Sequence, residues 1–278
     1  MKKKKQIILF SVVFAMVILM IISFVLITMN VESSKSTDLL FEAIENNDVQ
    51  TAKEAIENGA DLNKSQKVFS LVSFLGESHN PTPLWEACHK CDLEMVKLLV
   101  SSGADINALE PISKTSPLRA TFITVGKDER FSIAKYLIEN GADINLGNQT
   151  DVVLEKVLIG TGDNNEQIRN EAKELLLILI DKGFNLNSVR EKSALTYLAR
   201  YKNNATIAFL VKNKYCDINS LNYENQTALI VAAQLNDDQM VELLLSLGID
   251  KGIKDTYGKT AYDYAKELGY TKISDMLK

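Results

Sequence analysis

The chain has 278 residues, of which 46% are hydrophobic and 24% charged, the proportions of an ordinary folded protein. Its formal net charge is −5, but four of its 31 basic residues are the lysines at positions 2–5. The rest of the chain therefore has 27 basic and 36 acidic residues, a net charge of −9. Because nucleic acids and anionic lipids attract positive surfaces, this acidic region is not expected to bind either of them.

Residues 7–29 form an apolar segment of 23 residues without a charged residue, a glycine or a proline. As a helix the segment would be roughly 34 Å long, enough to cross a hydrocarbon core of about 30 Å. A cleaved signal peptide has an apolar region of only about 7–15 residues followed by small residues. This segment ends instead at Thr28 and Met29, and no cysteine in or just after it provides a lipoprotein cleavage site. We therefore predict an uncleaved signal-anchor, a single transmembrane helix over residues 7–29.

The charge around this segment predicts its orientation. The basic residues 1–6 precede it, and the first basic residue after it is Lys35. Since positive charge is retained in the cytoplasm, we expect a cytoplasmic N-terminus and an extracytoplasmic domain at the cell membrane. The alternative is a domain that faces the cytosol. Residues 30–37 are interpreted as a short tether to that domain.

After the tether, short apolar segments with helical spacing occur in pairs. The first pair, over 38–63, is expected to form two helices, the first capped by Thr37 or Asp38 and the second entered through a turn at Asn47 and Asp48. Residues 64–81 are interpreted as an extended finger or a short extra helix that packs on its neighbours. An exposed apolar patch for a partner is the alternative reading of that stretch.

A short motif closes each pair and repeats along the chain. GADLN begins at residue 59, GADIN at 103 and 141, GFNLN at 183, YCDIN at 215 and GIDKG at 248. Further units are predicted over 82–107, 116–145, 152–187, 193–219 and 227–250, with a C-terminal cap over 260–278. A spacing that approaches 33 residues indicates stacked units of one kind rather than a single core.

The second unit, TPLWEACHKCDLEMVKLLVSSGADIN, resembles the ankyrin repeat, whose pattern is T-P-L-H-x-A followed by V-x-x-L-L-x-x-G-A-D-x-N. The resemblance covers about 38–278 and implies an all-α repeat solenoid of helix-turn-helix units with hairpin loops. Pro83 suits the first turn of a helix, and Gly103 suits a left-handed position after one. The unit at 152–187 departs most from the pattern and is expected to contain a bend or a long loop.

The histidine of the T-P-L-H tetrad is missing from every unit. Its hydrogen bonds must therefore be absent or supplied by other groups. The residues at that position are Trp85, Arg119, Glu155, Thr196, Ile230 and Asp263.

Two histidines and two cysteines lie near residue 85, and such a cluster suggests a metal or redox site. His79, Cys88, His89 and Cys91 lie within 13 residues. In the repeat register, however, Cys88 occupies a small core position and Cys91 the turn between helices, and no second C-x-x-C pair exists to complete a zinc site. We predict no metal, no cofactor and a packed, free Cys216. A Cys88–Cys91 disulfide is an alternative if the domain is exported.

Catalytic motifs are also missing. No histidine is placed beside a nucleophile with a third group to orient it, and the Gly160-Thr161-Gly162 sequence lacks the G-K-[ST] ending of a phosphate loop. We predict that the chain is not an enzyme and has no small-molecule substrate.

The resemblance implies a binding surface made of hairpin tips and of exposed positions on the first helix of each repeat. Aromatic and arginine side chains are the types that anchor interfaces, so they are favoured among these positions. The candidates are Trp85, His89, Lys90, Arg200, Tyr201, Tyr223, Glu224, Gln226, Gln234, Tyr257 and Lys259, with Ile123, Thr124, Leu235 and Thr256 as further positions.

The expected function is that of a membrane-tethered module that binds a protein partner, for example as an inhibitor or immunity protein. The acidic domain would suit a basic partner. The first alternative is an envelope scaffold or stress-protective protein similar to the membrane-anchored ankyrin repeat proteins of bacteria. A weaker alternative is a redox protein that uses Cys88 and Cys91.

Overall fold

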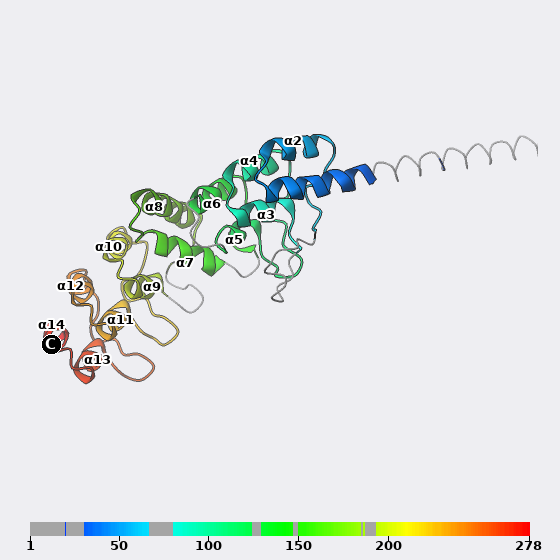
Figure 1. The fold of residues 1–278 in the computed structure, drawn as a ribbon. Helices are drawn as coiled ribbons and strands as arrows, with labels where there is room; N and C mark the ends of the chain where they lie inside the picture. Colours follow the sequence, from blue (N-terminus) through cyan, green and yellow to red (C-terminus); the bar gives the residue numbers. More distant parts are fainter. Residues whose placement is uncertain are drawn as a thin grey trace, which may run out of the picture. The chain divides into compact units, whose positions relative to one another are not determined.

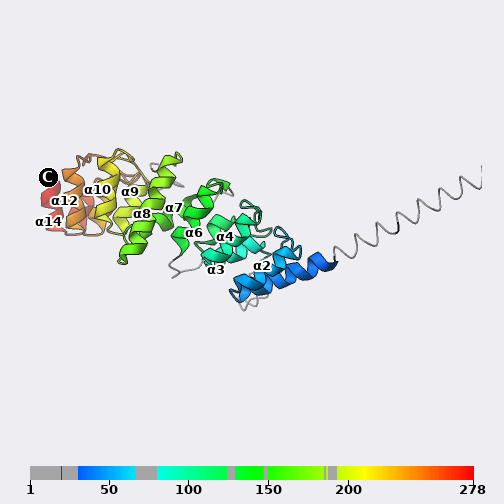
Figure 2. The ribbon, with the colours of Figure 1, turned by 90° about the horizontal axis from the view of Figure 1, so that it is seen from above.

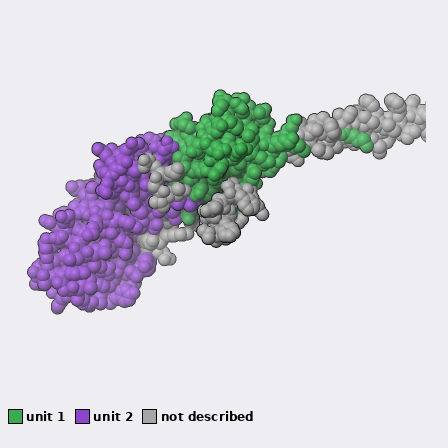
Figure 3. All heavy atoms as spheres, in the orientation of Figure 1, with its two compact units in different colours: residues 1–121 green, residues 122–278 purple. Residues whose placement is uncertain are grey.

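The computed structural model describes residues 20, 31–66, 80–123, 129–146, 150–184, 186 and 193–278. Every regular element in these ranges is a helix, which confirms the predicted all-α repeat architecture. The chain divides into two compact units, residues 1–121 and 122–278, coloured separately in Figure 3.

The first unit stacks two layers of short helices. Helix α3 packs against α4 and α5, while α2 packs against α4. A further helix over residues 31–45 precedes α2. The bounds are Val49–Glu57 for α2, Pro83–Lys90 for α3, Leu93–Ser101 for α4 and Pro117–Ala120 for α5.

The start of this unit differs from the expectation. Residues 31–45 form one helix, so the predicted cap at Thr37 or Asp38 is wrong, and the described part of the predicted tether is helical. Thr37 is fully buried: its hydroxyl donates to the Ser33 carbonyl oxygen at 2.7 Å and accepts the Asp61 backbone N–H at 2.9 Å. Because the hydroxyl bonds a preceding carbonyl and a distant loop, it is not used to begin a helix.

The second unit contains the most regular part of the stack. The first helices α7, α9, α11 and α13 pack on one another in chain order, and α10, α12 and α14 form a second layer, visible in Figures 1 and 2. The bounds are Arg130–Glu139 for α6, Thr150–Gly160 for α7, Glu166–Asp181 for α8, Ala194–Arg200 for α9, Asn204–Lys212 for α10, Ala228–Gln234 for α11, Asp238–Ser246 for α12, Ala261–Glu267 for α13 and Thr271–Leu277 for α14.

Local sequence explains where the helices begin. A threonine or serine with extended backbone caps the first helix at five of the six predicted openings, and its hydroxyl accepts a backbone N–H from the first turn. Pro83 occupies the first turn after its cap, as predicted, and Pro117 does the same. The irregular unit begins instead at Thr150 and has the longest of the labelled helices, α8, with 16 residues. The five caps are Thr82, Ser116, Ser193, Thr227 and Thr260.

The repeated G-A-D-x-N motif is a structural framework. Gly103 has a φ of 95°, the left-handed conformation that the sequence predicts. The carboxylate of Asp105 then accepts the Asn107 backbone N–H at 2.9 Å and closes a tight turn. The side chain of Asn63, from the preceding motif, accepts the Asp105 backbone N–H at 2.7 Å. The motif therefore both turns the chain and links one repeat to the next.

The register around residue 215 needs a correction. Sequence comparison of the motifs places Tyr215 at the glycine position, but the left-handed residue is Lys214, with a φ of 59°. Cys216 is buried, like Ala104 of the second unit. The chain thus has one additional residue between the turn and the buried small side chain.

Candidate protein-binding face

Two hairpin fingers extend from the second unit, and Figure 1 shows them beyond helices α9, α11 and α13. In the first finger, the side-chain oxygen of Asn222 accepts the backbone N–H groups of Glu224 at 3.0 Å and Gln226 at 2.8 Å. In the second finger, Asp255 accepts those of Tyr257 at 2.9 Å and Lys259 at 3.0 Å. One polar residue at the base of each finger therefore determines the conformation of its tip.

The base of the second finger is also electrostatically stabilised. Burial alone would raise the pKa of Asp255, but hydrogen bonds from the Tyr264 hydroxyl, at 2.5 Å, and from backbone N–H groups outweigh it and lower the pKa. Burial, followed by this bond to Asp255, raises the pKa of Tyr264 to about 12. At neutral pH Asp255 is thus a carboxylate that accepts a hydrogen bond from the protonated hydroxyl of Tyr264.

Large aromatic side chains are exposed on this side of the second unit. Tyr257 is 69% exposed, Tyr223 59% and Tyr201 53%. The first two lie on the fingers, and Tyr201 directly follows α9. A backbone hydrogen bond from Thr256 to the Glu224 carbonyl oxygen, at 2.9 Å, joins the two fingers. Aromatic side chains often anchor protein interfaces, and here two of the three are exposed on fingers that are held by hydrogen bonds.

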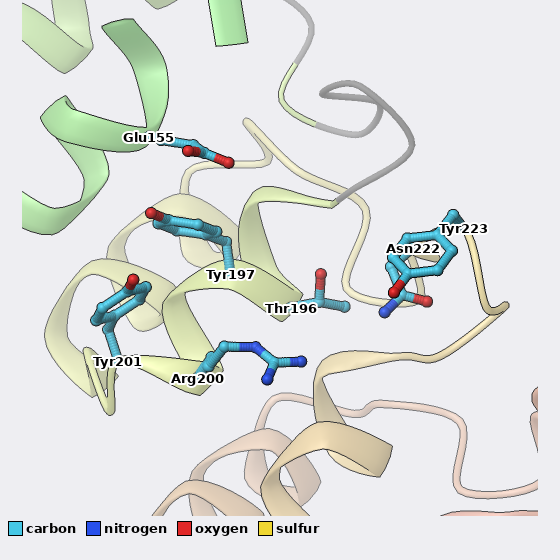
Figure 4. A pocket seen from close by; sticks show the side chains of 7 residues that line it. All are labelled: Glu155, Thr196, Tyr197, Arg200, Tyr201, Asn222 and Tyr223. Carbon is cyan, nitrogen blue, oxygen red and sulfur yellow. The ribbon is translucent and has the colours of Figure 1, made fainter. Parts of the chain in front are cut away.

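A pocket of about 390 Å³ lies between helices α7 and α9 and the first finger (Figure 4). Packing of α7 on α9 brings the Glu155 side chain above the ring of Tyr197. The rings of Tyr197 and Tyr201, one helical turn apart, have centroids separated by 4.9 Å and planes tilted by 41°. The lining residues are Glu155, Thr196, Tyr197, Arg200, Tyr201, Asn222 and Tyr223.

The pocket is polar, and its environment favours the protonated form of Tyr197. Burial, a hydrogen bond with Tyr201 and the nearby Glu155 carboxylate all raise the pKa of Tyr197 above its ordinary value. The formal charges on the lining residues are those of Glu155 and Arg200. In Figure 4 the Arg200 side chain extends along α9 in the direction of the finger and ends beside Thr196.

The structure brings three predicted residues together in this pocket, namely Arg200, Tyr201 and Tyr223. Sequence reasoning missed Tyr197 and Asn222 as part of the same surface. The signal for Tyr197 was available, because residues four apart on a helix share a face, and Tyr201 follows it at that spacing.

Two predicted contact residues are not accessible. Trp85 is 2% exposed, its indole N–H donates to the Thr115 hydroxyl at 2.8 Å, and its ring stacks on His89 at 5.2 Å. Trp85 therefore donates a hydrogen bond through its indole N–H at the position where the pattern has histidine. Gln226 is 3% exposed and accepts a hydrogen bond from the Asn222 side chain at 3.2 Å. Both predictions are wrong because these side chains are core and brace residues.

Other predicted residues lie at the surface with partners inside the protein. The Lys90 ammonium pairs with the Glu45 carboxylate at 2.9 Å, and that of Lys259 pairs with Glu267 at 2.6 Å. Gln234 is half-buried and bonds the Tyr264 hydroxyl. Glu224 is half-buried in the first finger, and Ile123 is exposed. Thr124 and His79 lie outside the described residues.

The cysteines are free and buried. Burial, followed by the proximity of Cys91, raises the pKa of Cys88 well above its ordinary value. Burial, followed by Asp217, raises the pKa of Cys216 to about 12. Reactive thiols have lowered pKa values, so the shifts at Cys88 and Cys216 are opposite to those of a reactive thiol. No cluster of three or more metal-ligating side chains occurs among the described residues.

A second pocket, of about 550 Å³, lies at the turns between paired helices of the second unit. Its floor is structural: the Asn203 amide donates to the Thr161 hydroxyl at 2.8 Å, and the Asn203 side-chain oxygen accepts the Thr206 N–H at 3.2 Å. The side-chain amide of Asn203 thus links neighbouring repeats through its hydrogen bonds.

The predicted membrane anchor falls outside the described residues, except for Met20. In the part of the chain that is described, no helix has the length and apolar character to span a membrane.

Comparison with known proteins agrees with this geometry. The family model described as ankyrin repeats, in three copies, matches residues 17–110, 40–148 and 166–255. The chain belongs to the ankyrin repeat family. Ankyrin repeats generally mediate protein–protein interaction, and the exposed fingers of this chain are consistent with that role.

Curated relatives share parts of this repeat stack. The ankyrin repeat protein YahD of Escherichia coli (strain K12) is 28% identical over 156 residues, which are 54% of this chain and 73% of YahD. Alpha-latrotoxin-Lh1a of Latrodectus hasselti is 42% identical over 62 residues, or 22% of this chain. The matched region spans only 5% of that toxin's length.

Solved structures share the fold at low sequence identity. The ankyrin repeat domain of human ASB11 has a TM-score of 0.61 and 18% identity, covering 86% of this chain and 95% of that domain. The ankyrin repeat domain of Bcl-3, a member of the IkappaB protein family, has a TM-score of 0.61 and 17% identity, with coverage of 86% and 97%.

Proposed function

We propose that this protein is a membrane-tethered module that binds a protein partner through the fingers and first helices of its ankyrin repeats. The observation that carries the proposal is the exposure of Tyr201 and Tyr223, which line one pocket, and of Tyr257 on the adjoining finger. Three large aromatic rings in contact with water leave apolar surface unburied and do not stabilise the fold. A binding role therefore accounts for them better than packing does.

The tethering part of the proposal rests on the sequence. Residues 7–29 have the length and composition of a membrane anchor, and the lysines before them favour a cytoplasmic N-terminus. The repeat domain would then lie outside the cytoplasm, close to the membrane surface. Protease treatment of intact cells with a permeable outer layer tests this topology: the repeat domain should be digested, and its protection would place it in the cytosol.

The class of partner follows from charge at long range. The chain beyond its N-terminal lysines has a net charge of −9, which favours encounter with a basic protein. An inhibitor or immunity protein that captures such a partner at the cell surface is the form of this function that we propose. A stoichiometric complex whose association rate falls steeply with added salt is the expected behaviour.

Site-specific crosslinking tests the binding role. A photoreactive amino acid is placed at Tyr201, Tyr223 or Tyr257 in the full membrane-bound chain, and the same label at Glu242, an exposed residue of α12, is the matched control. A single crosslinked protein from the three tyrosine positions and none from Glu242 supports the proposal. The absence of any defined crosslinked species would instead favour a diffuse scaffold in the envelope.

A further inference from the structure

We infer that the pocket between α7, α9 and the first finger receives an aspartate or glutamate side chain from an extended segment of the partner. The inference rests on the proposed function and names the chemistry of one contact within it. The carboxylate would bind the Arg200 guanidinium, and the tyrosines of the pocket would pack against the neighbouring part of the segment.

Arg200 carries the first step of the argument. It is the last residue of α9, its side chain is exposed, and it forms no ion pair with any described residue. In this respect it differs from Lys90 and Lys259, which each pair with a glutamate. In Figure 4 its guanidinium lies beside Thr196, and the side chain extends in the direction of the first finger. A planar guanidinium in such a position matches a carboxylate through two parallel hydrogen bonds.

Tyrosine side chains form the wall around that guanidinium. Tyr197 and Tyr201 form one side, with ring centroids 4.9 Å apart, and Tyr223 stands on the opposite side in Figure 4. Because the pKa of Tyr197 is raised, its hydroxyl is a neutral donor and does not repel an anion. Tyrosine rings also offer apolar area to the aliphatic part of a peptide at a low cost in conformational entropy.

Size and the second charge restrict the occupant. The volume of about 390 Å³ falls in the lower part of the range of roughly 300–1,000 Å³ typical of ligand pockets, so it fits a few residues of a peptide. Glu155 lies above Tyr197 on the same wall and would repel a doubly charged phosphate more strongly than a single carboxylate. A carboxylate side chain in a linear segment is therefore the favoured ligand.

This local preference is compatible with a partner that is basic as a whole. Net charge acts over a screening length of about 8–10 Å and governs encounter, whereas a guanidinium–carboxylate pair acts at contact and governs register. A basic partner with one acidic residue in its bound segment would satisfy both.

Selection from a phage-displayed library of random peptides on the full chain in detergent micelles tests the inference. We expect enriched peptides to have Asp or Glu at one fixed position beside an aromatic or aliphatic residue. Arg200→Gln should weaken their binding about tenfold, the loss expected for a charge-assisted hydrogen bond. Arg200→Lys should have an intermediate effect, because lysine keeps the charge but not the planar fork.

The matched control is Lys266→Gln, which removes a cation of α13 that does not line the pocket and should leave peptide binding unchanged. An unchanged urea midpoint for Arg200→Gln establishes that this variant is folded. Selected peptides without an acidic position, equal binding by Arg200→Gln, or a failure to select any peptide would each overturn the inference. If a partner still crosslinks at Tyr223 in that case, the proposed function stands and only the pocket assignment falls.

Discussion

Replacing Trp85 by phenylalanine separates the two roles that its sequence position allows. If Trp85 were a contact residue, the change would alter partner binding and leave stability nearly unaffected. In the structure its ring is buried, stacks on His89 and donates a hydrogen bond to Thr115 at 2.8 Å. The substitution should therefore act on the free energy of unfolding.

The magnitude follows from the two interactions that are lost. Loss of the indole N–H bond costs about 1 kcal/mol. The smaller phenylalanine ring buries roughly 40 Å² less apolar surface, which at about 25 cal/mol/Å² costs about 1 kcal/mol more. The variant should thus be destabilised by about 2 kcal/mol, and Trp85→Ala by about 3–5 kcal/mol.

Urea unfolding followed by circular dichroism, on the full chain in detergent, measures both values. Thr115→Val and the double variant complete a cycle, in which the coupling energy between the two positions should be about 1 kcal/mol. Tyr257→Phe is the exposed control and should lie within about 0.5 kcal/mol of the parent. A Trp85→Phe variant with parental stability, or a coupling energy near zero, would refute the buried-anchor argument.

Four further substitutions test the framework, three by urea unfolding and the fourth by the dependence of stability on acid pH. Gly103→Ala should destabilise the protein by about 1–2 kcal/mol because φ at this position is 95°. Lys214→Gly should stabilise it by up to about 1 kcal/mol, because glycine adopts a positive φ without strain. Equal effects of the two substitutions would count against the revised register. Gly160→Ala should destabilise by about 1–2 kcal/mol despite its better helix propensity, since the new Cβ would lie 2.4 Å from the Phe131 ring; parental stability would show that the ring can move. Because the pKa of Asp255 is lowered in the fold, its stabilisation is present above its ordinary value of 3.8 and is lost as pH falls through the lowered value. Asp255→Asn should remove that part of the acid dependence, and an unchanged acid profile would contradict the assignment.

The repeat architecture was predictable because its signals are local. Capping residues such as Thr82 and Thr227, and left-handed glycines such as Gly103, act within a single turn of chain. Their spacing therefore indicates the fold even when intervening residues differ. The register at residues 214–216 was predicted wrongly because one inserted residue moves the turn to Lys214 and leaves the following C-D-I-N sequence in place.

The candidate site was predictable only in part. The resemblance to the ankyrin repeat indicates which hairpin tips and first-helix positions face away from the core of their own repeat, and Arg200, Tyr201 and Tyr223 were found in this way. It does not indicate contacts between repeats, and the burial of Trp85 depends on Thr115, 30 residues away. The position of Gln226 likewise depends on the packing of one finger against its own base.

Photocrosslinking from Tyr223 in the native membrane tests the central claim most directly. The account predicts one defined protein crosslinked at Tyr223 and none at Glu242, an exposed residue of α12. The same protein captured equally from both positions, or no defined product from Tyr223, would contradict binding through the fingers.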